Sequence, residues 1–175
     1  MRLSRKSGTF WALAITITVL DFITKQMAEA NLQRGQPVEV LGELLRFTLG
    51  YNTGIAFGLS LGGASRWLLV AVTMATMGLI FWLFRSVDER HKAQVIAFGL
   101  IMGGAAGNLL DRIFGDHGVV DFIDVGIGQS RFWTFNIADS AITVGAVLLV
   151  LSSLFERQTP AEKTDPKKRP KEATQ

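Results

Sequence analysis

The residues that could perform chemistry are concentrated between Gly103 and Asp139. This stretch contains acids, amides and an arginine, at the point where two long apolar segments meet a polar loop. Charged groups close to lipid are costly, so their concentration here indicates a functional site. Asp121 and Asp139 are the two candidate catalytic groups. Asp121 lies in an apolar setting between Val120 and Phe122, and Asp139 lies where the last apolar segment begins.

Two carboxylates that face each other cannot easily both ionise, so the pKa of one rises and the pair shares a proton. The ionised member can take a proton from water. The protonated member can polarise a carbonyl group and later serve the leaving amine. The pair Asp121 and Asp139 therefore predicts hydrolysis of a peptide bond without a covalent intermediate or a metal, with the proton on either carboxylate.

Other catalytic groups are scarce in this sequence. It contains no cysteine, which excludes thiolate nucleophiles, disulfides and Cys-based metal sites. His91 and His117 are isolated from each other and from any ligand-like spacing, and no Gly-x-Ser-x-Gly motif is present. We therefore expect no metal and no cofactor. A purely structural explanation remains open for Asp139, because Asn136 and Asp139 have the spacing of a helix capping box.

The elements that must position these groups are four apolar blocks in a chain of 175 residues, 49% of them hydrophobic. Each block has roughly the 17–25 residues that a helix needs to cross a bilayer. We expect one four-helix transmembrane domain over residues 1–158 and a disordered basic tail over residues 159–175, which is rich in proline and charge. The blocks are Phe10–Ala28, Trp67–Phe84, Ala93–Leu110 and Ile137–Phe155.

The first block resembles a cleavable signal peptide, with a basic start and the small-x-small sequence Ala28-Glu29-Ala30. Asp21 and Lys25 separate the apolar run from that sequence, so a retained span is the better interpretation. The two residues are four apart on one helical face, where an acid followed by a base can form an ion pair. Two roles remain open for Asp21 and Lys25: a structural ion pair that holds the helices together, or a role at the edge of the functional site.

The basic residues predict the orientation. Twelve of the eighteen lie before the first block, between the second and third, or after the fourth. The positive-inside rule then makes both termini cytoplasmic and places loops at about 29–66 and 111–136 outside. The positive-inside rule also explains the net charge of +3, so this charge does not indicate that the protein binds nucleic acid.

Two further patterns concern packing. Gly99, Gly103 and Gly107 recur at four-residue intervals, which lets another helix approach closely in lipid. Residues 36–58 change character, and the segments 38–40 and 44–49 are interpreted as short strands with turns at Gly42 and Gly50.

Five motifs, in order across the four blocks, closely resemble those of lipoprotein signal peptidase, also called signal peptidase II. The resemblance covers about residues 10–155. The motifs are Asp21-x-x-x-Lys25, Asn52-Thr53-Gly54-Ile55-Ala56-Phe57, Gly103-Gly104-Ala105-Ala106-Gly107-Asn108-Leu109-Leu110-Asp111-Arg112, Val119-Val120-Asp121-Phe122 and Phe135-Asn136-Ile137-Ala138-Asp139.

The resemblance implies an aspartic endopeptidase of the bacterial cytoplasmic membrane that acts as a monomer. Its substrates would be prolipoproteins carrying diacylglyceryl on a cysteine, cut just before that cysteine. The fold implied is an all-α membrane protein with a small extracytoplasmic β element, whose site near the outer face meets substrate and membrane lipids. Asp121 and Asp139 would be the catalytic dyad. The substrate-binding or supporting residues would be Asn52, Gly54, Asn108, Asp111, Arg112, Asn136, Asp21 and Lys25.

A proton-coupled transporter or channel subunit is the competing function, because Asp21 and Lys25 could serve as a proton relay. Transporters commonly show internal repeats or interrupted helices in corresponding halves, and this sequence shows neither.

Overall fold

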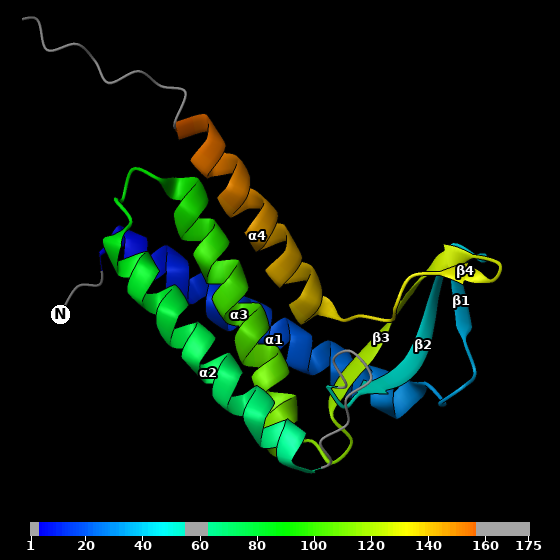
Figure 1. The fold of residues 1–175 in the computed structure, drawn as a ribbon. Helices are drawn as coiled ribbons and strands as arrows, with labels where there is room; N and C mark the ends of the chain where they lie inside the picture. Colours follow the sequence, from blue (N-terminus) through cyan, green and yellow to red (C-terminus); the bar gives the residue numbers. More distant parts are fainter. Residues whose placement is uncertain (1–3, 55–62, 157–175) are drawn as a thin grey trace, which may run out of the picture.

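The computed structural model describes residues 4–54 and 63–156, and in this part of the chain four long helices form a bundle with a small sheet at one end (Figure 1). The expected tail over residues 159–175 and the motif residues Ile55–Phe57 lie outside the described residues. The helices are α1 (Arg5–Asn31), α2 (Gly63–Ser86), α3 (Lys92–Phe114) and α4 (Ile137–Glu156). The strands are β1 (Val38–Leu41), β2 (Leu45–Asn52), β3 (Val119–Ile127) and β4 (Ser130–Arg131).

Each predicted apolar block is a helix, and each helix is long and apolar enough to cross a membrane. Large apolar side chains cover the outside of the bundle; Ile15, Phe22, Trp82 and Val150 are each at least half exposed. Helices that are apolar on their outer as well as their inner faces are typical of a lipid environment. The bundle is therefore built to be surrounded by lipid.

Helix α3 is the centre of the bundle and packs against α1, α2 and α4. The glycine pattern explains its close approach to α1. A Cβ atom on Gly103 would lie 2.7 Å from the carbonyl oxygen of Ala14, and one on Gly107 would lie 2.5 Å from Asp21 Oδ2. Gly99 faces Leu13 and Phe10 in the same way. The prediction that these glycines permit close helix packing is confirmed.

The sheet is antiparallel with the strand order β1-β2-β3-β4. The two predicted strands and the turn at Gly42, where φ is +52°, are confirmed. The turn predicted at Gly50 is wrong: Gly50 lies within β2 opposite Asp121, next to an irregularity in the register.

Two further expectations need correction. The class all-α is inexact, because the chain adds a four-stranded sheet to its helices. In addition, the third helix extends to Phe114, so the polar segment begins at Gly115 rather than at residue 111. Asp121 and Asp124 then lie on strand β3 and not in a loop.

Candidate active site

Asp139 occupies the first turn of α4, where the predicted capping box is formed. Its backbone N–H donates to Asn136 Oδ1 at 2.9 Å, and the Asn136 N–H donates to Asp139 Oδ2 at 3.3 Å. The exchange satisfies two N–H groups at the helix start, and the helix dipole favours a negative charge there. The other carboxylate oxygen, Oδ1, accepts a hydrogen bond from Asn108 at 2.8 Å.

Asp121 is brought to the start of α4 by main-chain pairing between β3 and the segment that leads into the helix. The Ile123 N–H donates to the Phe135 carbonyl at 2.8 Å, and the Phe135 N–H donates back at 3.0 Å. This pairing places Asn136 beside Asp121, and its amide donates to Asp121 Oδ1 at 2.7 Å. Asn136 is fully buried and thus contacts both candidate catalytic acids.

The environment of Asp121 raises the pKa of its carboxyl from 3.8 to about 7. Burial is the largest cause, since only 4% of the residue is exposed, and the negative charge of Asp139 is the second. Hydrogen bonds from Asn136 and Asn52, together with the charge of Lys25, act in the opposite direction. Removal from water disfavours the charged form of an acid, so the Asp121 carboxyl keeps its proton to a higher pH than an ordinary aspartate does.

Asn108 connects the acid pair to the polar interior of the bundle. Its amide nitrogen donates to Asp139, and its amide oxygen accepts from Asn136 at 3.2 Å and from Lys25 at 3.0 Å. Asn108 is buried, as are Asn136 and Lys25. Buried polar groups are costly unless they are hydrogen-bonded, and this network satisfies them.

Lys25 holds three acceptors with its ammonium group. The distances from Nζ are 2.6 Å to Asp21, 2.8 Å to Asp111 and 3.0 Å to Asn108. Asp21 in turn accepts a hydrogen bond from the Ala138 N–H at 2.9 Å, next to Asp139. The predicted Asp21–Lys25 ion pair is therefore present, and it is joined directly to the candidate site as well as linking helices.

Asp111 and Arg112 support the site separately rather than as a pair. Asp111 Oδ2 is engaged by Lys25 and accepts the Val120 N–H at 3.2 Å, which anchors the residue next to Asp121. Arg112 donates to the Asn108 carbonyl at 3.1 Å and lies within the electrostatic reach of Asp139, Asp111 and Asp121.

Asn52 and Gly54 form a turn directly after β2. The Asn52 side-chain oxygen accepts the Gly54 N–H at 2.9 Å, and Gly54 has a φ of +79° that favours glycine. A Cβ atom on Gly54 would also collide with the side chain of Leu69 in α2. The turn lies opposite Val119, the first residue of β3, and Asn52 hydrogen-bonds Asp121 from there.

Two acids near the site do not join it. Asp116 is exposed in the bend before β3. Asp124 is buried and bonded to Thr48 at 2.9 Å and to Arg131 at 2.6 Å, away from the network. No sequence pattern indicates this second cluster, because its three members come from three different strands. Among the described residues, no group of three or more His, Cys, Asp or Glu is arranged to hold a metal ion.

The fold and the site together define a class: a membrane enzyme whose polar site is built at one end of a four-helix bundle. A solved structure described as a bacterial membrane enzyme has the same fold, with a TM-score of 0.79 and 30% identity over 90% of this chain and 94% of that chain. The family model described as "Signal peptidase (SPase) II" matches residues 13–155. The chain belongs to this family, and it is a membrane protease of lipoprotein processing.

Relatives named lipoprotein signal peptidase cover most of the chain. The protein from Hydrogenovibrio crunogenus is 40% identical over 157 residues, which are 88% of this chain and 90% of the relative. The protein from Francisella tularensis subsp. novicida is 35% identical over 90% of this chain and 99% of its own length. Family membership therefore favours a protease over the transporter alternative.

Proposed function

We propose that this protein is an aspartic endopeptidase that removes signal peptides from diacylglyceryl-modified prolipoproteins, cleaving just before the lipidated cysteine. The observation that carries the proposal is the position of Asn136. One buried side chain bonds Asp121 and caps the helix turn that holds Asp139. Two carboxylates held together in this way, one buried on a strand and one on a helix N-terminus, fit the asymmetry that general acid–base catalysis needs.

In the proposed reaction Asp139 is the base and Asp121 is the acid. A water between them gives a proton to the Asp139 carboxylate, and its oxygen forms a bond to the scissile carbonyl carbon. Asp121 meanwhile gives its proton to the carbonyl oxygen as negative charge develops there, which leaves a neutral tetrahedral diol. Asp139 then returns its proton to the amide nitrogen, the C–N bond breaks, and a carboxylic acid and an amine leave. The carbonyl reforms as Asp121 recovers its proton, so no covalent intermediate, metal or cofactor is required.

The supporting residues would hold the two catalytic carboxylates and the substrate backbone in position. Asn108 and Asn136 orient the two carboxylates, and Lys25 with Asp21 and Asp111 fixes Asn108. We assign Asn52 and Arg112 to the substrate backbone: Asn52 lies at the exposed end of β2, and Arg112 supplies a positive charge beside three acids. Gly54 keeps the Asn52 turn in the conformation that this contact needs.

The proposed location is the bacterial cytoplasmic membrane, with both termini cytoplasmic and the sheet outside. A substrate anchored by acyl chains would then present its scissile bond at the depth of the acid pair. The segment that follows β4 carries two exposed aromatic residues, Phe132 and Trp133, which suit the membrane interface. A reporter active only outside the cytoplasm should give signal when fused after Gln129 and none when fused after Gln175. The reverse pattern would overturn the orientation. Residues 1–158 would form the peptidase domain and residues 159–175 the basic tail.

The decisive experiment is single-turnover cleavage of a lipidated prolipoprotein by purified protein in detergent. Asp121→Asn and Asp139→Asn should each lower the rate by at least about 10³-fold, because members of a catalytic unit fail together. Asp116→Asn is the matched control and should retain wild-type activity. Unlipidated precursor should not be cleaved, and a chelator should have no effect. An active Asp121→Asn variant, or activity lost in chelator and restored by zinc, would overturn the mechanism.

A further inference from the structure

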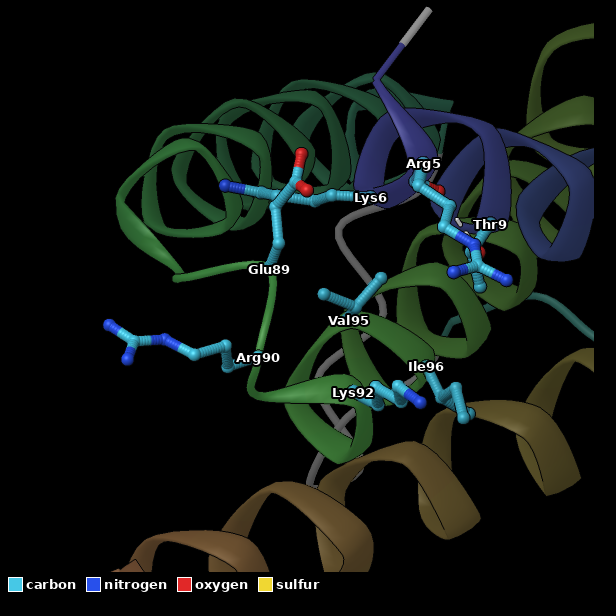
Figure 2. A pocket seen from close by; sticks show the side chains of 8 residues that line it. All are labelled: Arg5, Lys6, Thr9, Glu89, Arg90, Lys92, Val95 and Ile96. Carbon is cyan, nitrogen blue, oxygen red and sulfur yellow. Dashed lines mark hydrogen bonds between the residues drawn. The ribbon is translucent and has the colours of Figure 1, made fainter.

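A second polar feature lies at the end of the bundle opposite the sheet. There a cavity of about 430 Å³ opens between the start of α1, the α2–α3 connection and the start of α3 (Figure 2). This volume is within the range of about 300–1,000 Å³ that is typical of small-molecule sites. Four basic side chains and one acidic side chain line it: Arg5, Lys6, Arg90, Lys92 and Glu89. The cavity therefore has a positive excess that the candidate active site does not share.

Two of the four cations are already engaged within the protein. The Lys6 ammonium donates to the carbonyl of Arg85 at 3.0 Å and to that of Val87, at the end of α2. Arg90 is paired with Asp88 at 3.0 Å, is 87% exposed, and extends away from the other lining residues in Figure 2. Neither cation is available as the main contact for a ligand in the cavity.

Arg5 and Lys92 are different. Both are exposed, and within residues 4–54 and 63–156 neither forms an ion pair. They approach the cavity from two different helices, with Val95 between them (Figure 2). Two such cations on separate elements can contact one anionic group from two sides.

The starts of helices α1 and α3 are a second, independent indication that the cavity suits an anion. Arg5 is the first residue of α1 and Lys92 the first residue of α3, and neither helix has an acid in its first turn. The positive end of a helix dipole disfavours basic residues and favours an anion. Two helix starts with this unfavourable arrangement converge on one cavity, and a bound anion would relieve both.

The remaining lining residues indicate that the anion is part of a lipid. Val95 and Ile96 form an apolar wall, and Ile96 is 37% exposed on the outside of the bundle, where acyl chains would lie. Glu89 offers a carboxylate that can accept hydrogen bonds from headgroup hydroxyls. Basic pockets between transmembrane helices are suited to anionic headgroups.

We propose that this cavity binds the headgroup of an anionic glycerophospholipid, with the phosphate between Arg5 and Lys92 and the acyl chains along Ile96. The proposal does not depend on the aspartic mechanism, because the cavity and the acid pair lie at opposite ends of the bundle. The simpler explanation of the same charges is a diffuse positive surface produced by the positive-inside rule. The two explanations differ in whether the position of each charge matters.

Native mass spectrometry of the detergent-purified full chain, titrated with phosphatidylglycerol, distinguishes them. Each of Arg5→Gln and Lys92→Gln should weaken binding about fivefold, the usual effect of one basic residue on anionic lipid. Arg85→Gln removes a charge at the same end of the bundle but outside the cavity and should leave binding unchanged. Arg5→Lys keeps the charge and should retain binding. In lipid-free detergent, prolipoprotein cleavage should match the wild type for all four variants, and none of them should lower the melting temperature, since a basic residue at a helix start is unfavourable without a bound anion.

Three results would overturn the proposal. An equal loss in Arg85→Gln would mean that the attraction is diffuse. Equally tight binding of phosphatidylethanolamine would mean that the net charge of the lipid is irrelevant. Displacement of the lipid by millimolar inorganic phosphate would indicate a site for free phosphate rather than for a lipid headgroup.

Discussion

The amide oxygen of Asn108 accepts a hydrogen bond of 3.0 Å from the buried ammonium of Lys25. A lysine can only donate, so this contact determines which end of the Asn108 amide faces which neighbour. The oxygen faces Lys25, and the nitrogen must face Asp139, to which it donates at 2.8 Å. A charge in the interior of the bundle thus orients a hydrogen-bond donor at the candidate active site.

The Asn108→Asp variant tests this relationship. The new carboxylate would still accept from Lys25, so the interior network would persist, but it could not donate to Asp139 and would place a like charge beside it. We expect the cleavage rate to fall by about 10²–10³-fold, as when one preorganised donor is removed from an active site. Single-turnover cleavage and thermal melting measure the two effects separately. Activity near that of the wild type would mean that the Asn108 donor does not support catalysis.

The pH dependence of cleavage follows from the raised pKa of Asp121. If the reaction needs the protonated Asp121, kcat/KM should be lost as the pH rises through about 7, the pKa of this carboxyl in the free enzyme. Because Asp121 and Asp139 interact, the midpoint belongs to the pair rather than to one residue. The measurement is a kcat/KM profile from pH 5 to pH 9 with one lipidated substrate. A rate that instead increases steadily through pH 7 would reverse the assignment of acid and base.

The same pKa predicts how Asp121 affects stability. The ordinary pKa of an aspartate carboxyl is 3.8. Between this pH and about pH 7, the Asp121 carboxyl of the native protein keeps a proton that the unfolded chain has lost. The native state then binds more protons, so the free energy of unfolding decreases as the pH rises across this window. Asp121→Asn removes the titration and should stabilise the protein by on the order of 4 kcal/mol above pH 7. The difference in melting temperature between variant and wild type should grow from pH 4 to pH 7 and then level off. A constant difference would contradict the shift.

The helices could be predicted from the sequence because lipid requires long uninterrupted apolar segments, and this signal needs no partner. The location of Asp121 on a strand could not be predicted from the sequence. Strand β3 is buried on both faces along its first four residues, so it lacks the alternation of apolar and polar residues that identifies a strand. The wrong prediction of a turn at Gly50 has a similar cause. The irregularity in the pairing of β2 and β3 depends on both strands, and neither sequence segment reveals it.

The candidate site was only partly predictable. Asn136 and Asp139 are three residues apart, so their capping box is visible in the sequence. The contacts of Lys25 with Asn108 and Asp111 join residues more than eighty positions apart, and they depend on the way α1 packs against α3. The motifs predicted which residues belong to the site, but no spacing rule indicated that one ammonium group connects Asp21, Asp111 and Asn108.

Asp124 offers a test that separates structure from catalysis. Its carboxylate accepts from Thr48 on β2 and from Arg131 on β4, so it fastens three strands together. Asp124→Asn should weaken the bond to the Arg131 guanidinium and destabilise the protein by about 1–2 kcal/mol. Cleavage at low temperature should stay within a few-fold of the wild type. A variant that melts normally but does not cleave would place Asp124 in the catalytic machinery. Asp116→Asn, which changes an exposed acid in the bend before β3, should alter neither property.

The packing of α1 against α3 gives the last prediction. A Cβ atom on Gly103 would lie 2.7 Å from the Ala14 carbonyl oxygen and 2.8 Å from Ile17 Cβ. The obstacle is main chain, so Gly103→Ala must push the helices apart, and we expect a loss of about 1–3 kcal/mol of stability. Gly78→Ala in α2 is the matched control, because a Cβ atom there would meet nothing within 4 Å. Alanine at that position should stabilise the helix by up to about 1 kcal/mol.

Since the displaced helices carry Lys25 and Asn108, Gly103→Ala should also slow cleavage in the fraction that remains folded. Melting temperature and single-turnover cleavage of both variants in detergent are the measurements. Equal melting temperatures for Gly103→Ala and Gly78→Ala would show that the helices can separate without cost at this point.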